Sequence, residues 1–236
     1  EPGRFTIVDP RLEAAPAGVA LLRELPQEGS FDAILLGVKP QMLGEVAPAL
    51  EALAGPGTVL LSILAGVELA TLAERFPRAA CRVRIMPNLA AAIGKSPIAL
   101  VADGASDARR AIDVLMAPLG TAEWLEQEGL MDLVTALAGS GPAFVYRFID
   151  ALSQGAAALG LPPEQAGRLA LSMVEGAALL AAASPHSPGE LARRVASPGG
   201  LDTLDRDGAL ARLIEATLRS ARDRSVEMAA EARRKG

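Results

Sequence analysis

The sequence predicts an α/β fold in its first half and an all-helical fold in its second half. Up to about residue 127, short apolar segments alternate with helical patterns, and beyond that point only helical patterns follow. The apolar segments lack polar alternation, which is typical of strands buried on both faces of a parallel sheet. Aromatic residues make up only 3% of the chain, which favours closely packed helices over an aromatic-rich β-sandwich. We therefore expect two domains, residues 1–127 and 128–236.

Strands and helices alternate along the first domain. The expected strands cover residues 4–8, 33–38, 58–63, 82–86 and, more weakly, 98–102. Helical patterns lie between them at residues 41–53, 69–76 and 106–116, and Ser106-Asp107 is expected to cap the last of these. Such alternation predicts a parallel sheet with right-handed crossovers.

The second domain is rich in alanine and punctuated by Gly and Pro. Breaks are expected at 139–142, 160–163, 184–185 and 197–200, with helices between them, including 188–195 and a last amphipathic helix from residue 208 to about 234. No strand is expected beyond residue 129. The apolar character of these helices, 169–180 above all, predicts a dimer.

Composition excludes several classes of protein. The net charge of −5 and the scarcity of aromatic residues argue against a nucleic-acid binder. One cysteine and one histidine exclude a disulfide framework and a Cys- or His-based metal site, so no metal is expected. The most apolar stretch, residues 58–67, has about half the length needed to cross a bilayer. No export signal is visible, and a cytoplasmic, membrane-free protein is expected.

The ends of the predicted strands are the candidate ligand site, because open parallel sheets bind ligands outside the carboxyl ends of their strands. These ends are Asp9-Pro10-Arg11, Gly37 to Gln41, Ser62 to Gly66, and Met86-Pro87-Asn88. The alternative is that they are ordinary strand-to-helix turns, in which Gly, Pro and Asn are common. No Gly-x-Gly-x-x-Gly occurs in the sequence, so the usual pyrophosphate-binding loop of a dinucleotide fold is absent from it.

Two glycine-containing loops in the helical half are further candidates. In Gly139-Ser140-Gly141-Pro142, the proline should break or begin a helix. In Ser197-Pro198-Gly199-Gly200, two glycines can turn several backbone N–H groups towards one carboxylate. The alternative for each is a simple connection between helices.

Side chains suited to acid–base or nucleophilic catalysis are scarce. His186 follows a Ser-Pro turn and is expected at the surface or as a cap, and Cys81 is expected as a small packed hydrophobe. Glu128, like Glu126, is expected to be solvated. An enzyme with this inventory would rely on positioning and on cofactor chemistry.

An ordered set of motifs resembles the pyrroline-5-carboxylate reductase family over nearly the whole chain. The motifs are Val38-Lys39-Pro40-Gln41; Ser62-Ile63-Leu64-Ala65-Gly66-Val67; Arg84-Ile85-Met86-Pro87-Asn88 followed by Gly94; the run from Val134 to Phe144; Gly160-Leu161-Pro162; and Ser197-Pro198-Gly199-Gly200. Each motif alone is common, but their order, with a helical domain after an α/β domain, is specific.

The resemblance implies a Rossmann-like domain for NADPH or NADH, then a helical domain that forms a homodimer, with rings of dimers in some members. Carried over by position, the cofactor would be bound by Asp9, Arg11, Gly37, Val38, Lys39, Pro40, Leu64, Ala65, Gly66 and Asn88. The substrate would be bound by Val195, Ser197, Gly199, Gly200, Leu201 and Asp202, and the catalytic set would be Ser197, Gly199, Gly200 and Thr203.

The implied reaction is reduction of 1-pyrroline-5-carboxylate to L-proline, the final step of proline biosynthesis. An iminium carbon is already electrophilic, so hydride transfer from NAD(P)H needs alignment rather than a strong acid on the protein. A relative with the same fold but altered or lost catalysis, acting as a binding or oligomeric protein, is the alternative. A 2-hydroxyacid or ketopantoate type of reductase would need a lysine on the helical domain, and beyond residue 130 only Lys235 is present.

The chain departs from the family pattern in three places. Family members begin with a strand and a glycine-rich loop ahead of the strand that ends at Asp9, so we expect a βα unit that these residues do not include. The stretch after Gly200 is about five residues shorter than expected, and Asp202 would repel a carboxylate substrate. Asp9 favours a free ribose hydroxyl, whereas Arg11 suits a 2′-phosphate, so the preferred dinucleotide stays open.

Overall fold

The chain folds into two compact units in the computed structural model, which describes residues 1–104, 107–196 and 204–235. The first unit contains Glu1–Met131 together with Ser225–Gly236, and the second contains Asp132–Arg224. The last helix therefore contributes residues to both units. The predicted bounds of 1–127 and 128–236 remain predictions.

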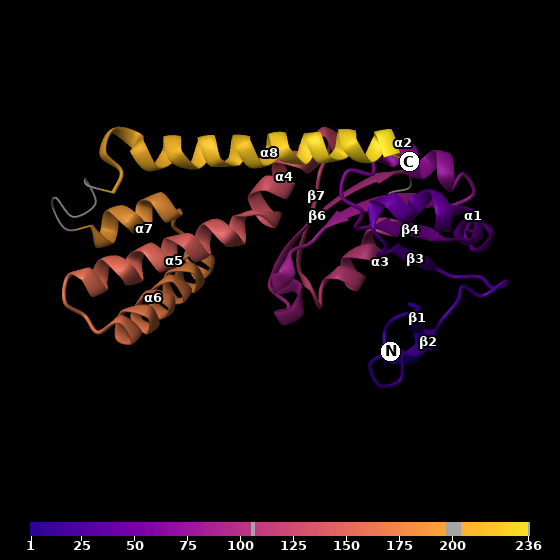
Figure 1. Cartoon of the computed structure of the whole chain (residues 1–236), viewed down its shortest axis with the longest axis horizontal. Helices are drawn as coiled ribbons and strands as arrows, with labels where there is room; N and C mark the ends of the chain where they lie inside the picture. Colours follow the sequence, from indigo (N-terminus) through magenta and orange to yellow (C-terminus); the bar gives the residue numbers. More distant parts are fainter. Residues whose placement is uncertain (105–106, 197–203, 236) are drawn as a thin grey trace. The chain divides into compact units, whose positions relative to one another are not determined.

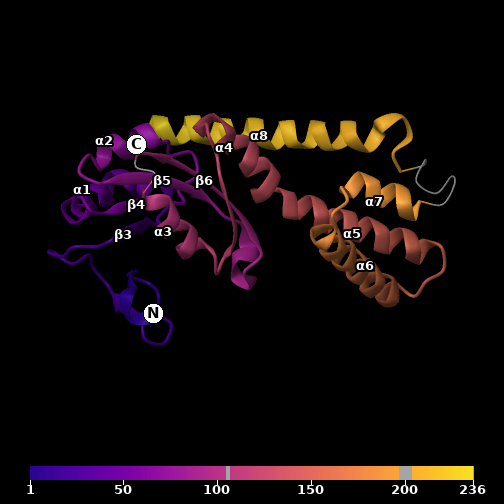
Figure 2. The same cartoon turned by 180° about the vertical axis from the view of Figure 1, so that it is seen from behind.

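The strands in the described part of the first unit form two sheets, which Figures 1 and 2 show from opposite sides. The strands are β1 (Thr6–Val8), β2 (Ala20–Leu22), β3 (Ala33–Leu36), β4 (Val59–Ser62), β5 (Cys81–Met86), β6 (Ser96–Asp103) and β7 (Gly120–Trp124). β1 and β2 form a separate two-stranded parallel sheet, and the other five pair in the order β3-β4-β5-β6-β7.

Helices connect these strands and build the second unit. They are η1 (Pro2–Arg4), η2 (Pro40–Met42), α1 (Leu43–Leu53), α2 (Leu69–Arg75), η3 (Leu89–Ile93), α3 (Asp107–Met116), η4 (Glu128–Leu130), α4 (Met131–Val134), the π-helical turn η5 (Thr135–Gly139), α5 (Gly141–Ala158), α6 (Pro163–Ala183), α7 (Pro188–Val195), η6 (Arg206–Gly208) and α8 (Ala209–Lys235). Beyond Trp124 the described residues contain no strand, as expected. The proposed Ser106 cap of α3 lies outside the described residues.

The five-stranded sheet is parallel except at one pair. β3, β4 and β5 pair in parallel, and so do β6 and β7, but β6 runs antiparallel to β5. The expectation of a wholly parallel sheet was wrong at this pair. Only η3 and a few flanking residues join β5 to β6, whereas a parallel crossover needs about a dozen residues or more.

Two strands were not expected from the sequence. β7 contains Thr121 and Glu123, both exposed, and so lacks the continuous apolar run by which the other strands were found. β2 has only three residues. Both lie at the edge of their sheet, where one side of the strand has no neighbour to bury it.

The core of the first unit lies between the sheet and its helices. Fully buried side chains from three central strands include Leu61, Val83 and Leu100, and they pack with Ile112 and Met116 of α3. Such close packing of aliphatic side chains is what the Ala-, Leu- and Val-rich composition favours.

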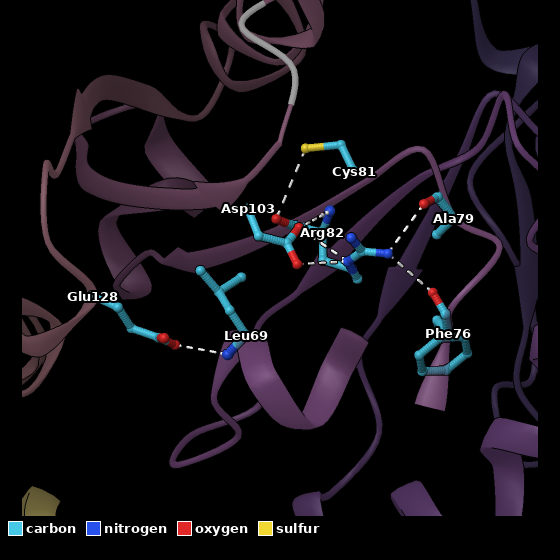
Figure 3. Close-up of polar contacts among 7 residues, drawn as sticks. All are labelled: Leu69, Phe76, Ala79, Cys81, Arg82, Asp103 and Glu128. Atoms are coloured by element: carbon cyan, nitrogen blue, oxygen red, sulfur yellow. Dashed lines mark hydrogen bonds and ion pairs between the residues drawn. The ribbon is translucent and has the colours of Figure 1, made fainter. Parts of the chain in front are cut away.

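An ion pair joins the start of β5 to the end of β6 (Figure 3). Arg82 on β5 and Asp103 on β6 are register partners, and their side chains approach to 2.7 Å between Nε and Oδ2. The same guanidinium donates to the carbonyl oxygens of Phe76 (3.2 Å) and Ala79 (3.1 Å). One side chain thus fixes the turn between α2 and β5 to the sheet.

In the second unit, α5 and α6 pack against each other. Pro142 stands in the first turn of α5, as its position after Gly141 predicted. α6 is long and apolar enough to cross a membrane by length and composition, although only 11% of its most apolar window is buried within one chain.

Burial should make Cys81 a reporter of unfolding. Its side chain is 2% exposed, and desolvation, followed by the charge of Asp103, raises the pKa of the thiol. Because the thiolate is the reactive form, we expect an aromatic disulfide reagent at pH 8 to label the native protein far more slowly than the urea-unfolded chain. Prompt native labelling would contradict this burial.

Candidate functional site

Three predicted site loops leave neighbouring strands at the same edge of the sheet. Leu36 on β3, Ser62 on β4 and Arg84 on β5 are aligned by parallel pairing. Gly37 and Ile63 therefore leave the sheet at one level, and the turn leading to Asn88 starts two residues further along β5. By this register the three segments leave the sheet at its carboxyl edge, and their role as a ligand site stays a prediction.

The loop after β3 presents backbone and one cation to solvent. Gly37 and Lys39 are exposed, whereas Val38 and Pro40 are half-buried. A Cβ placed on Gly37 would meet no atom within 4 Å, so the glycine borders open space. Pro40 begins η2, which leads directly into α1.

The loop after β4 is anchored at its start and turns sharply in its middle. Leu64 is 4% exposed, and its N–H donates to Ser62 Oγ at 3.3 Å. Ala65 is exposed, and Gly66 adopts a φ of 76°, in the left-handed region that favours glycine. Because Leu64 is buried, Ala65 has only a methyl group and Gly66 has no side chain, the backbone of this loop can approach a ligand closely.

The turn after β5 is fixed by hydrogen bonds at Asn88. Its N–H donates to the buried Ser96 Oγ on β6 (2.8 Å), and its Oδ1 accepts from the N–H of Ala90 (2.9 Å), which caps η3. Both the backbone and the carboxamide of Asn88 are thus oriented before any ligand arrives.

Asp9 and Arg11 follow β1, which belongs to the two-stranded sheet and not to the sheet that carries the other three loops. Asp9 Oδ1 accepts from the N–H groups of Arg11 (2.7 Å) and Leu12 (3.1 Å). These backbone hydrogen bonds are the main reason why the pKa of Asp9 lies below its ordinary value. The carboxylate is therefore ionised at neutral pH and held in a tight turn.

Glu128 is not a solvated surface residue, contrary to expectation. Its Oε1 accepts from the N–H of Leu69, the first residue of α2, and from Arg84 Nη1, each at 2.7 Å (Figure 3 shows the contact with Leu69). The side chain of Arg84 is only 10% exposed, and that of Glu128 is 29% exposed. A buried guanidinium needs an anionic partner, and Glu128 supplies it while capping the helix that follows the Leu64–Gly66 loop.

The sequence did contain a signal for this pair. Arg84 stands between Val83 and Ile85 on a strand otherwise read as buried, and charged residues are rarely buried without a partner. The identity of that partner could not be found from spacing, because Glu128 lies 44 residues further along the chain.

The predicted substrate loop lies outside the described residues. This applies to Ser197, Gly199, Gly200, Leu201, Asp202 and Thr203. Val195, the last residue of α7, is described and 80% exposed. His186 is half-buried in the turn before α7, with Nδ1 at 3.3 Å from Glu190 Oε2.

Comparison with known proteins identifies the family. Residues 128–235 match the family model described as pyrroline-5-carboxylate reductase dimerisation. A pyrroline-5-carboxylate reductase from Pseudomonas aeruginosa is 36% identical over 205 residues, which are 84% of this chain and 75% of that protein. The chain belongs to the pyrroline-5-carboxylate reductase family. The family inferred from the motifs is thus confirmed, and its members are NAD(P)H-dependent oxidoreductases.

Solved structures of this family share the fold. A pyrroline-5-carboxylate reductase from Coxiella burnetii is 27% identical, with a TM-score of 0.81 covering 89% of this chain and 81% of that one. The Plasmodium falciparum enzyme, crystallised with NADP bound, is 22% identical with a TM-score of 0.77, covering 97% of this chain and 88% of that one. The expected α/β domain followed by a helical dimerisation domain is confirmed.

The carboxyl edge of β3, β4 and β5 fits part of a dinucleotide. Open space at Gly37, the exposed backbone at Ala65 and the fixed Asn88 suit a flat ring and a ribose laid across the strand ends. The pyrophosphate-binding glycine motif is absent from the given residues, so they account for only part of a dinucleotide site.

Removing the carboxylate of Glu128 should destabilise the first unit. We expect Glu128→Ala to lower the free energy of unfolding by about 3 kcal/mol, because Arg84 is left buried without its partner. Glu128→Gln keeps an acceptor for the Leu69 N–H and should lose less. Urea unfolding followed by the fluorescence of Trp124, the single tryptophan, measures both.

The matched control is Glu126→Ala, which removes an exposed carboxylate two residues away. It should change stability by no more than about 0.5 kcal/mol. Equal effects of the two alanine substitutions would show that the contacts of Glu128 contribute nothing.

Proposed function

We propose that this chain reduces 1-pyrroline-5-carboxylate to L-proline with NAD(P)H, the final step of proline biosynthesis. The observation that carries the proposal is the alignment of three family motifs, at Gly37, Gly66 and Asn88, on one sheet edge of a chain that belongs to the family.

The bound dinucleotide would supply the hydride, and the protein would supply position. The backbone at Gly37 to Pro40 and at Leu64 to Gly66 would border the cofactor, and the preset carboxamide of Asn88 would lie near the nicotinamide. Asp9 and Arg11 would take part from the two-stranded sheet. The NADP in the Plasmodium falciparum structure supports the choice of cofactor class for this fold.

The substrate carboxylate would be held by the 197–203 loop. Val195 would precede a run of backbone N–H groups at Ser197, Gly199 and Gly200, with Leu201 and Asp202 beside them and Thr203 as the hydroxyl. Charge-assisted hydrogen bonds of this kind contribute about 1.5–3 kcal/mol each. Alignment over an electrophilic iminium carbon then suffices for reduction, which agrees with a chain that has a single histidine and a single cysteine.

The test is turnover by the full chain. Oxidation of NADPH or NADH in the presence of 1-pyrroline-5-carboxylate, with proline as product, is the expected result, and the ratio of the two rates gives the cofactor preference. A folded protein that turns over neither cofactor would favour the alternative, a binding or oligomeric relative that has lost catalysis.

Substitution of Gly37 should weaken cofactor binding without unfolding the protein. Because the space around its Cα is open, Gly37→Val fits the fold but fills the volume that the dinucleotide would occupy. We expect the Kd for NADPH to rise about tenfold or more, which corresponds to about 1.4 kcal/mol. NADPH fluorescence measures the binding.

Gly44→Ala, which adds a methyl group at an open position in α1, is the control and should leave that Kd unchanged. Equal affinities of Gly37→Val and the wild type would remove Gly37 from the site.

Homodimerisation would bury the apolar faces of α5 and α6. Leu171, Leu179 and Leu180 of α6 are each more than half exposed in the single chain, and Tyr146 of α5 is 66% exposed. A second copy covering these faces accounts for the apolar length of α6 in a soluble, cytoplasmic enzyme. Further assembly of dimers into a ring is part of this proposal.

Placing a charge on this face should dissociate the dimer. Leu180→Glu is expected to sediment as a monomer at micromolar concentration, because the carboxylate would be buried against apolar side chains of the partner. Leu159→Glu, beyond the end of α5 at a residue that is 92% exposed, is the control and should remain dimeric. A dimeric Leu180→Glu protein would place the interface elsewhere.

A further inference from the structure

The C-terminal part of α8 rests directly on the loop after β4. A Cβ placed on Gly66 would lie 2.7 Å from Ala229 Cα, 3.3 Å from its backbone nitrogen and 3.2 Å from its Cβ. Ala229 is 5% exposed. The contact is therefore one backbone against another, and it belongs wholly to the first unit, in which the end of α8 lies beside α2 (Figures 1 and 2).

Hydrogen bonds hold the two ends of this loop, and the Val67 N–H donates to the Leu64 carbonyl oxygen (3.3 Å) across the turn between them. At the start, the Leu64 N–H is bonded to Ser62, and at the end the Leu69 N–H is bonded to Glu128. Between them, neither Ala65 nor Gly66 makes a hydrogen bond within the described part of the chain. Beside that turn hydrogen bond, packing against Ala229 is the contact that holds Gly66 itself.

We propose that Ala229 is a positioning residue for the dinucleotide, acting through Gly66. Its small side chain lets α8 approach the loop and sets the position of the half-buried Gly66, and with it the exposed Ala65, relative to the sheet edge. A larger residue at 229 cannot be accommodated by rotation of a side chain at Gly66, because glycine has none. This role rests on the proposed function, since it concerns the cofactor loop of the reductase.

The experiment compares Ala229→Ser, Ala229→Val and Ala229→Leu in the full chain. Amide hydrogen exchange of residues 63–69 is measured without dinucleotide, and the Kd for NADPH is measured by its fluorescence. Exchange and Kd should both rise with side-chain size, with a Kd increase of about tenfold for leucine and less than about threefold for serine. At saturating NADPH, the KM for 1-pyrroline-5-carboxylate should change less than about twofold.

Two controls separate positioning from loss of fold. Ala216→Leu makes the same change at an exposed position of α8 and should leave loop exchange and NADPH affinity as in the wild type. Protection of the Cys81 thiol reports whether each variant keeps its core, and the smaller serine and valine variants keep the series informative if leucine unfolds the protein.

The outcomes distinguish this role from the function itself. Wild-type NADPH affinity and loop exchange in folded Ala229→Val and Ala229→Leu would overturn the positioning role while the reductase function stands. A parallel rise of the Kd and the KM for substrate would also overturn it, because a general loss of structure would then explain the data. Failure of the folded wild type to bind NADPH at all would overturn the proposed function and this role with it.

Discussion

Arg84 places a positive charge inside a sheet whose core is mostly apolar, and the neutralisation of that charge links several parts of the first unit. The partner, Glu128, comes from the segment where this unit ends, and its carboxylate also caps α2. One interaction therefore fixes three parts of the chain: the strand that leads to Asn88, the helix that follows the Leu64–Gly66 loop, and the exit towards the helical unit. Because a single buried charge is costly, these parts can form only together, and the geometry of the site follows from that requirement.

The candidate site has few side chains that could take part in catalysis, and this indicates how it can work. The segments at the carboxyl edge contain one lysine, one asparagine, one glutamine, one serine and otherwise apolar residues and glycine, with no histidine, cysteine or carboxylate among them. Instead, the structure holds the loop backbone in place. Ser62, Ser96 and Glu128 accept hydrogen bonds from its N–H groups, and Ala229 packs against Gly66. Reduction of an iminium carbon is a reaction for which alignment and exclusion of water are sufficient.

The sequence predicted those features that follow from local pattern. The strands β3, β4 and β5 and the positions of their loops could be found because continuous apolar runs ending in Gly or Pro are a local signal. The direction of β6 depends on the length of the connection from β5, which the pattern alone did not weigh. Glu128 follows Glu126 and Gln127 in a polar stretch of sequence. Its pairing with Arg84 is a tertiary contact and has no local signal. Motifs placed the substrate carboxylate at 197–203, and that assignment remains a prediction.

Gly37 and Gly66 show that the sequence alone does not predict what occupies the space beside a strand-end glycine. Both follow a parallel strand, both belong to family motifs, and both were expected to let the backbone approach a ligand. In the structure, the space beside Gly37 is open, whereas the corresponding space beside Gly66 is filled by Ala229, 163 residues away along the chain. The first glycine leaves room for a ligand, and the second leaves room for the protein itself. Which neighbour a strand-end glycine makes room for, a ligand or another segment packed behind its loop, is therefore decided by tertiary packing rather than by motif.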